Sequence, residues 1–176
     1  LRKGQPYKTQ LQDGIAGRGL VVQDVDAPSN IVWGRILDFD NYHKMVPKTV
    51  LASKIYKKEY VGGGNKQSIR VAMKVGVPQW NLQLFMNHLY DPAQHSLTWT
   101  LDYNRKSDLD DSCGYWYVIP HPEDPIHKTR VFYSVEVSMF PWVPQFVVDF
   151  MSKQALTDAT AWVKKYSEIE AAKLAP

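Results

Sequence analysis

The chain has 176 residues, of which 44% are hydrophobic, 22% charged and 12% aromatic. This balance is typical of a globular domain of ordinary size and excludes an intrinsically disordered chain. The formal net charge is only +3 and the lysines and arginines are scattered, so the composition gives no support for nucleic-acid binding.

The single cysteine, Cys113, excludes an intrachain disulfide, and no catalytic signature surrounds it. No apolar run approaches the ~20 residues of a membrane-spanning helix, and no signal peptide is visible. We therefore expect an intracellular location. Because the chain begins at Leu1 rather than Met, an organellar location reached through a removed targeting segment stays open.

The N-terminal region divides into two parts. Residues 1–18 are polar and rich in glycine, which predicts an irregular arm before a single domain over residues 19–172. Residues 19–26 have the β-branched content of a strand. Two short helices are then predicted, one from Pro28 or Ser29 to Asp38 and one over residues 39–46.

Six further strands are predicted from β-branched content, alternation and turn residues. The connections between them are too short for parallel crossovers, so antiparallel order is expected. Alternation is clearest at Ile69, Val71, Met73 and Val75. The six predicted strands cover residues 50–61, 66–75, 80–90, 96–103, 114–120 and 129–139.

The last predicted element is a long helix from Pro144 to about Ala172, because this stretch begins with proline and contains no internal glycine or proline. It has a broad apolar stripe formed by Val147, Val148, Met151, Ala155, Ala159, Trp162, Tyr166 and Ile169. The pattern as a whole predicts an α+β fold in which a curved, seven-stranded antiparallel sheet grips this helix. Such a sheet leaves room for a cavity between sheet and helix.

This order of elements resembles the helix-grip fold of the START-like (SRPBCC) superfamily, and is most similar to its coenzyme Q-binding and polyketide cyclase branch. The resemblance covers residues 19 to 168. The residues that carry it are Val25–Pro28, Val32–Trp33, Leu37–Tyr42, Met45–Pro47, Val75–Pro78, Leu97–Trp99 and Gly114–Trp116. It implies binding of an apolar ligand such as a lipid, an isoprenoid quinone, a sterol or a carotenoid. Separately from the resemblance, the absence of any coherent ligand spacing predicts that neither a metal nor an organic cofactor is needed.

The apolar faces of the strands and of the long helix predict which residues would line the cavity. They are Val71, Met73, Leu84, Trp99, Trp116, Tyr133, Val135, Val137, Val147, Met151, Ala155 and Trp162. Two apolar connections are expected to flank its entrance, and their residues are Val77, Pro78, Pro141, Trp142 and Val143. The first could equally be a plain hairpin turn, and Trp142 could instead fold back as a plug in the core. A Trp-bearing loop at an entrance would also suit transient contact with a membrane surface.

Two other functions stay open. A cyclase or dehydratase would need an acid–base group in the cavity, for which Asp158, Tyr133 and His88 are the candidates. A non-catalytic subunit of a larger assembly would bind a protein partner instead. The acidic run Asp108–Asp111 lacks the pattern of a calcium loop, and the five histidines lack the spacing of metal ligands, so no metal site is expected.

Overall fold

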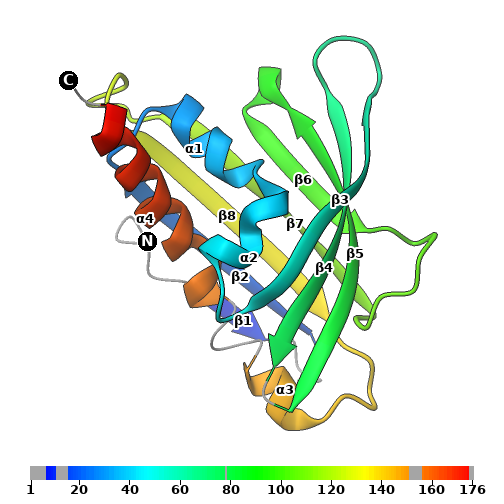
Figure 1. The fold of residues 1–176 in the computed structure, drawn as a ribbon. Coiled ribbons are helices and arrows are strands. Elements are labelled where there is room, and N and C mark those ends of the chain that lie inside the picture. Colours follow the sequence, from blue (N-terminus) through cyan, green and yellow to red (C-terminus); the bar gives the residue numbers. More distant parts are fainter. Residues whose placement is uncertain (1–6, 11–15, 78, 151–155, 175–176) are drawn as a thin grey trace.

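The computed structural model describes residues 7–10, 16–77, 79–150 and 156–174. They form one antiparallel sheet in the order β1-β2-β8-β7-β6-β5-β4-β3, accompanied by short helices and a long C-terminal helix (Figure 1). The strands are β1 (Tyr7–Gln10), β2 (Ala16–Val25), β3 (Val50–Tyr60), β4 (Gln67–Val77), β5 (Trp80–Asp91), β6 (Ser96–Leu101), β7 (Asp111–Pro120) and β8 (Thr129–Ser138). The helices are α1 (Ser29–Ile36), η1 (Phe39–Asn41), α2 (Tyr42–Met45), η2 (Pro92–Gln94), α3 (Gln145–Phe150) and α4 (Leu156–Leu174).

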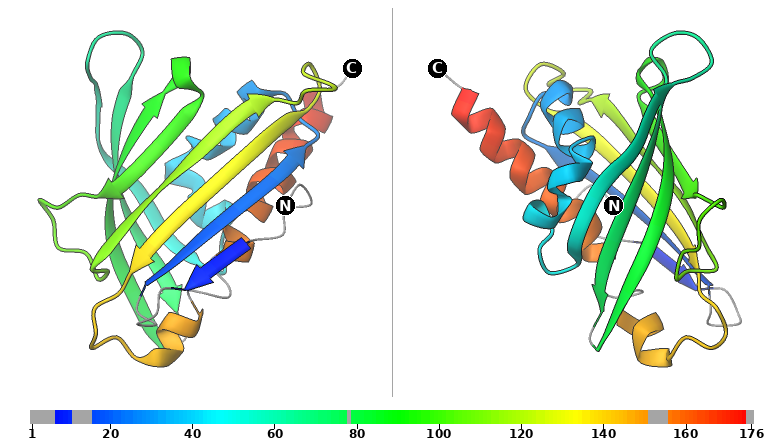
Figure 2. Two further views of the ribbon diagram at one scale, coloured as in Figure 1. Left: turned by 180° about the vertical axis from the view of Figure 1, so that it is seen from behind. Right: turned by 45° about the vertical axis from the view of Figure 1, so that its right-hand side comes forward.

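The sheet curves strongly, and α1, α2 and α4 all lie on its concave face (Figures 1 and 2). Helix α4 contacts both β2 and α1. This arrangement confirms the predicted helix-grip fold, including the two short helices after the first long strand. Among the described residues, no helix is both long and apolar enough to cross a bilayer.

The sheet has one more strand than the sequence predicts. Residues 1–18 were expected to be an irregular arm, but Tyr7–Gln10 pairs antiparallel with β2, with Tyr7 opposite Leu20. A four-residue polar strand has too little alternation to be recognised, and only pairing with β2 defines it. Strand β2 also begins earlier than expected, at Ala16.

The predicted C-terminal helix is described as two segments, α3 and α4, and residues 151–155 between them lie outside the described residues. Helix α3 begins directly after Pro144, whose carbonyl accepts a hydrogen bond from the Val147 amide at 2.9 Å. Val147 is fully buried and Trp162 of α4 is almost so. Both segments therefore direct apolar side chains to the core, but Ile169, which the sequence places on the same stripe, is 43% exposed.

Hydrogen bonds fix the helices over the sheet. The Gln23 side-chain amide on β2 donates to the backbone carbonyl of Thr160 on α4 at 2.8 Å, and this bond is buried. The Tyr42 hydroxyl donates to the Ile36 carbonyl and thereby closes the turn between α1 and α2. Neutral, buried hydrogen bonds of this kind define orientation without requiring a buried charge.

The connection from β6 to β7 completes the sheet instead of looping into solvent. Strand β6 pairs only with Met86–Asp91, so the first half of β5, which pairs with β4 on one side, has no strand on its other side. The connection supplies the missing partners: the Asp108 amide donates to the Gln83 carbonyl, the Asp108 carboxylate accepts from the Gln83 amide, and the Ser107 hydroxyl accepts from the Phe85 amide. The donor–acceptor distances are 2.7–3.0 Å.

One glycine is required by close packing. A Cβ at Gly114 on β7 would lie 2.3 Å from the Ser134 carbonyl oxygen and 2.3 Å from the Trp99 ring. At Gly34, on the exposed side of α1, a Cβ would meet nothing within 4 Å. The two glycines therefore make a matched pair for substitution.

We expect Gly114→Ala to lower the free energy of unfolding by about 1–3 kcal/mol, because Trp99 or the β8 backbone must move. Gly34→Ala should raise it by up to about 1 kcal/mol, because alanine favours a helix. Urea unfolding of both variants measures the difference. Equal effects of the two substitutions would show that Trp99 does not need the space over Gly114.

Candidate functional site

The strand pairing places the predicted cavity residues on one face of the sheet. Residues directly opposite each other across an antiparallel pair share a face. Trp99 is opposite both His88 and Gly114, Gly114 is opposite Val135, and Val135 is opposite Gly19. Residues an even number of positions along the same strands, and the residues opposite them, lie on this concave face as well. They include the remaining predicted strand residues Val71, Met73, Leu84, Trp116, Tyr133 and Val137.

An aromatic chain crosses this face and reaches the helices. The ring centroids of Trp99 and Tyr133 lie 5.6 Å apart, and those of Tyr133 and Trp116 lie 4.4 Å apart. Trp116 then meets the edge of Trp162 on α4 at 6.4 Å, and Trp162 packs on Tyr42 of α2 at 4.8 Å. Sheet, α2 and α4 are thus joined by stacked and tilted rings.

Beside this aromatic chain the sheet carries little side-chain bulk. Val135 lies between two glycines, Gly19 and Gly114, and Val137 lies between Gly17 and Ser112. Both valines are packed against the core yet remain partly accessible. Met73 and Tyr133 share this incomplete cover. Inward-facing apolar side chains in a filled core are normally covered completely.

His88 is the buried titratable group on this face. Its ring lies 4.4 Å from that of Phe39 and 6.2 Å from that of Trp99, and its Nδ1 is 3.3 Å from the Ile69 carbonyl oxygen. Burial lowers the pKa of His88 to about 4, because an imidazolium would be poorly solvated there. His88 is therefore neutral near pH 7. Sequence reasoning named it only as a possible acid–base group, because its burial depends on Phe39, which is distant in the chain.

Tyr133 is the second polar group among the aromatic rings. Burial raises the pKa of its hydroxyl well above the ordinary value, so the group stays protonated. Trp99 lies between Tyr133 and His88. Asp158, the third acid–base candidate, has a side chain outside the described residues, as do the predicted cavity residues Met151 and Ala155.

Near the two predicted entrance segments, the structure shows a contact between Trp142 of the second segment and Trp80, which was not among the predicted residues. Trp142 is 62% exposed, so it is not a plug in the core. Its ring stacks on Phe140 at 5.6 Å and lies 6.1 Å from Trp80, which begins β5. Val77 is only 5% exposed, because it is opposite Trp80 on the concave face, so its expected place at the rim is wrong.

The other predicted entrance residues differ in their exposure. Pro141 is exposed and Val143 is partly buried, while Pro78 lies outside the described residues. Leu51 is 47% exposed and lies against Gly76. Trp80 and Leu51 were missed, because each belongs to a strand and its exposure depends on how that strand ends.

The acidic connection is used by the protein itself. The Asp110 carboxylate accepts from the Ser138 hydroxyl at 3.2 Å, and the Asp111 carboxylate accepts from the Tyr103 hydroxyl at 2.8 Å. Over the described part of the chain, no group of His, Cys, Asp and Glu has the arrangement of a metal site. Burial and the nearby carboxylates of Glu136 and Asp111 raise the pKa of the Cys113 thiol, which makes it less reactive.

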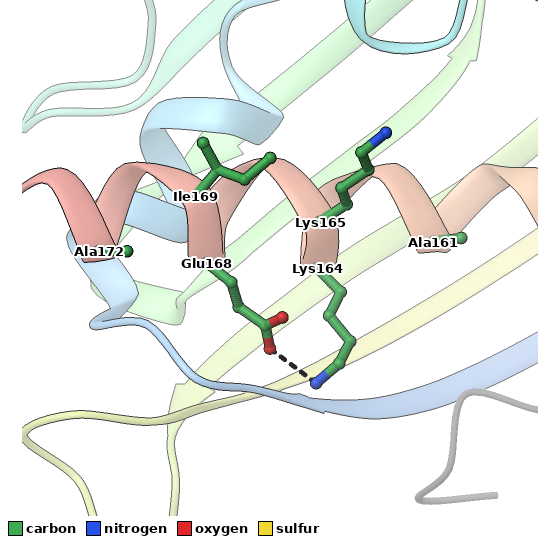
Figure 3. A pocket seen from close by; sticks show the side chains of 6 residues that line it. All are labelled: Ala161, Lys164, Lys165, Glu168, Ile169 and Ala172. Atoms are coloured by element: carbon green, nitrogen blue, oxygen red, sulfur yellow. Dashed lines mark ion pairs between the residues drawn. The ribbon is translucent and has the colours of Figure 1, made fainter.

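A separate depression of about 530 Å³ lies on the solvent side of α4 (Figure 3). The Lys164 ammonium and the Glu168 carboxylate, 2.8 Å apart, form an ion pair along it. The remaining lining residues are Ala161, Lys165, Ile169 and Ala172. It is open and faces away from the aromatic chain, so it is not part of the concave-face site.

Comparison with known proteins identifies the fold. Residues 20–175 match the family model described as polyketide cyclase/dehydrase and lipid transport. The Zhui aromatase/cyclase from a Streptomyces species has a similar structure, with a TM-score of 0.67 and 13% identity over 98% of this chain and 100% of the other. A fragment of the STAR-related lipid transfer protein from Xanthomonas axonopodis has a TM-score of 0.67 and 16% identity over 94% of each chain.

A START superfamily protein from Mycobacterium smegmatis is similar as well, with a TM-score of 0.65 and 16% identity over 90% of this chain and 99% of that one. No curated protein sequence matches. At these identities the similar structures show the fold alone, and the functions in their names differ.

The burial of His88 has a measurable consequence. Its folded-state pKa, about 4, lies below the ordinary value of 6.5, so the unfolded chain binds a proton first on acidification. Stability is therefore lost as pH falls from about 6.5 to about 4. We expect wild type to lose about 2–3 kcal/mol more than His88→Phe between about pH 7.5 and about pH 4.5. Urea unfolding at both pH values measures this, and identical losses would contradict a buried, neutral His88.

Proposed function

We propose that this chain, which belongs to the polyketide cyclase/dehydrase and lipid transport family, binds a hydrophobic small molecule between the sheet and α4 and carries or shields it. Candidate ligands are a lipid, an isoprenoid quinone, a sterol or a carotenoid. The observation that carries the proposal is the incompletely covered apolar region of Val135 and Val137, which lie opposite Gly19 and Gly17 of β2 and beside the Trp99–Tyr133 pair. A ligand that covers apolar side chains left partly exposed on an inner face removes their surface from water, and this lowers the free energy of the complex.

Catalysis is the second candidate, and the described residues support it less. Acid–base chemistry needs groups that exchange protons near neutral pH. His88 has a pKa of about 4, and burial raises that of Tyr133. On the concave face of β2 to β8, no described residue is a carboxylate. A role as a subunit of an assembly would leave the incomplete cover of Val135 and Val137 without a purpose.

Native mass spectrometry of the purified protein, followed by lipid extraction, tests the binding function. We expect a co-purified apolar molecule in wild type and a severalfold smaller bound fraction in Val135→Phe, because the larger side chain fills the space beside Gly19 on β2. Glu136→Phe is the matched control, since the neighbouring residue is exposed on the convex face of the same strand. A bound fraction that is equal in both variants would place any ligand elsewhere.

The surface around Trp142 supports transient docking to a membrane as part of this function. Trp142, Phe146 and Leu51 are exposed by 62%, 45% and 47%, which is unusual for large apolar side chains. Exposed Lys48 and Lys74 belong to the same end of the molecule: Lys48 precedes Thr49, whose carbonyl accepts from the Gly76 amide at 2.8 Å. Apolar side chains next to lysines suit a membrane that carries anionic lipids.

Burial of Trp142 and Phe146 in a bilayer would contribute about 2–5 kcal/mol, which gives weak and reversible docking. We therefore expect Trp142→Ala to reduce co-sedimentation with vesicles that contain phosphatidylserine and to slow ligand transfer between vesicles. Ile126→Ala is the control, because Ile126 is 72% exposed in the β7–β8 connection, at the opposite end of the molecule (Figure 1). If Trp142→Ala matches wild type in both assays, the membrane part of the proposal fails and ligand binding stands.

A further inference from the structure

Positive charge is concentrated in one part of the fold. Residues 44–74, from α2 to near the end of β4, contain eight of the 21 lysines and arginines but only one of the 18 acidic residues, Glu59. This segment has a formal charge of +7, whereas the rest of the chain, with 13 basic and 17 acidic residues, has a formal charge of −4. The small net charge of +3 therefore conceals a polarised molecule, and a surface of one sign attracts partners of the other.

Part of this charge lies on the convex face of the sheet. Helices α1, α2 and α4 all lie on the concave side and leave this face uncovered (Figure 2). Strand alternation places Lys54, Lys57 and Arg70 on the convex face, in rows that continue across β4 to Phe85 and its neighbours on β5. A bulge in the middle of β3 turns Tyr56 to the same face, where its ring meets that of Phe85 edge-on at 6.1 Å.

Arg105, from the connection between β6 and β7, lies over these two rings. Its guanidinium carbon is 4.3 Å from the ring centroid of Tyr56 and 5.1 Å from that of Phe85. Arg105 is exposed, and no carboxylate of the described residues forms an ion pair with it. The cation–π contact restrains the guanidinium while its charge stays accessible. A side chain held in this way loses little conformational entropy when it binds a carboxylate.

The base beneath Arg105 is held by hydrogen bonds. The Tyr56 hydroxyl donates to the Asp102 carboxylate at 2.6 Å, and the Arg70 guanidinium lies 3.6 Å from the same carboxylate. Burial and the bond to Asp102 raise the pKa of Tyr56 to about 12, so its hydroxyl remains a donor at neutral pH. Asp102 is almost completely buried. The rings that support Arg105 are therefore fixed before any partner arrives.

The pattern of charges favours a protein partner over a lipid surface. Lys57 pairs with Glu59 at 2.9 Å, whereas Lys54 and Arg105 have no ion pair among the described residues. A membrane presents a diffuse layer of charge and binds apolar side chains that insert, but here Arg105 covers the rings. Fixed cations beside an internal ion pair suit carboxylates at matching positions on a folded partner. Aromatic residues and arginine are also enriched at the centres of protein interfaces.

We propose that the convex face carries a docking surface for an acidic protein. This basic convex patch consists of Lys54, Lys57, Arg70 and Arg105 around Tyr56 and Phe85. Carboxylates of the partner pair with Arg105 and Lys54, and the two rings form the apolar centre of the contact. Because the patch is on the face opposite the ligand region, a partner can dock while that region is occupied. The inference goes beyond the proposed function and does not depend on it.

A poly-glutamate peptide is the probe for polypeptide carboxylates, and its Kd is measured by titration at about 50 mM and about 150 mM salt. We expect it to bind wild type, and to bind Arg105→Glu about tenfold more weakly, because a contacting cation becomes an anion. Lys54→Glu should behave alike, which covers the case in which one variant fails to fold. Lys165→Glu is the matched control, since Lys165 is an exposed lysine of α4, on the other side of the sheet.

We expect Lys165→Glu to change Kd by less than about twofold, because long-range repulsion alone is screened by salt. An equal loss of affinity in Arg105→Glu and Lys165→Glu would show diffuse attraction and overturn the inference, as would no binding to wild type. Tighter binding of polyuridylate than of poly-glutamate would assign the patch to nucleic acid and overturn it as well.

The membrane alternative is tested with vesicles that contain phosphatidylserine. We expect Arg105→Glu to reduce co-sedimentation no more than Lys165→Glu does. A loss as large as that caused by Trp142→Ala would assign the patch to the membrane and overturn the inference. The fraction of protein with a co-purified apolar molecule should be equal in Arg105→Glu and wild type, so the patch and the proposed function can fail separately.

A measurement on the unaltered protein requires no variant. On addition of poly-glutamate, the backbone amide NMR signals that move should cluster at Tyr56, Phe85 and Arg105. Displacements centred on Lys165 or on Trp142 would place the acidic probe elsewhere and overturn the inference.

Discussion

The indole of Trp99 lies directly over the backbone of Gly114, in space that any other residue at position 114 would occupy. This contact sets the position of the ring, and the ring sets the positions of its neighbours. Tyr133 stacks on one side of Trp99 and His88 lies on the other. Through Tyr133 and Trp116 the contact extends to Trp162, and so determines where α4 lies over the sheet.

The same contact explains why one part of the concave face is crowded and the adjacent part is open. The rings concentrate bulk on β6, β7 and the middle of β8, while Gly17 and Gly19 on β2 leave Val137 and Val135 with small neighbours on that side. Membership of a family that spans cyclases, dehydrases and lipid transport does not decide between binding and chemistry. The neutral lining favours binding over chemistry. It can cover an apolar molecule, but among the described residues it has no carboxylate that could take part in acid–base catalysis.

Much of this arrangement could be predicted from the sequence. Side chains along a strand alternate between the two faces of the sheet. The alternating apolar residues therefore predict that Val71, Met73 and Val135 share one face, as the strand pairing shows. The predictions that failed concern residues whose structural partners are distant in the chain. The pairing of Tyr7 with Leu20, the burial of Val77 against Trp80 and the bonds between Asp108 and Gln83 leave no local pattern. The neutral state of His88 also arises only when Phe39 covers it.

The edges of the sheet show how the fold limits contact between copies of the chain. An unpaired strand edge can recruit a strand from another molecule and start aggregation. Where β6 ends early, Ser107 and Asp108 occupy the hydrogen-bonding groups of β5 that would otherwise be open. The outermost strand on that side, β3, carries the exposed lysines Lys54, Lys57 and Lys58. Lys57 pairs with Glu59 at 2.9 Å, so two copies that approached through β3 would bring the positive charges of Lys54 and Lys58 together, and this repulsion disfavours pairing of the β3 edge with itself.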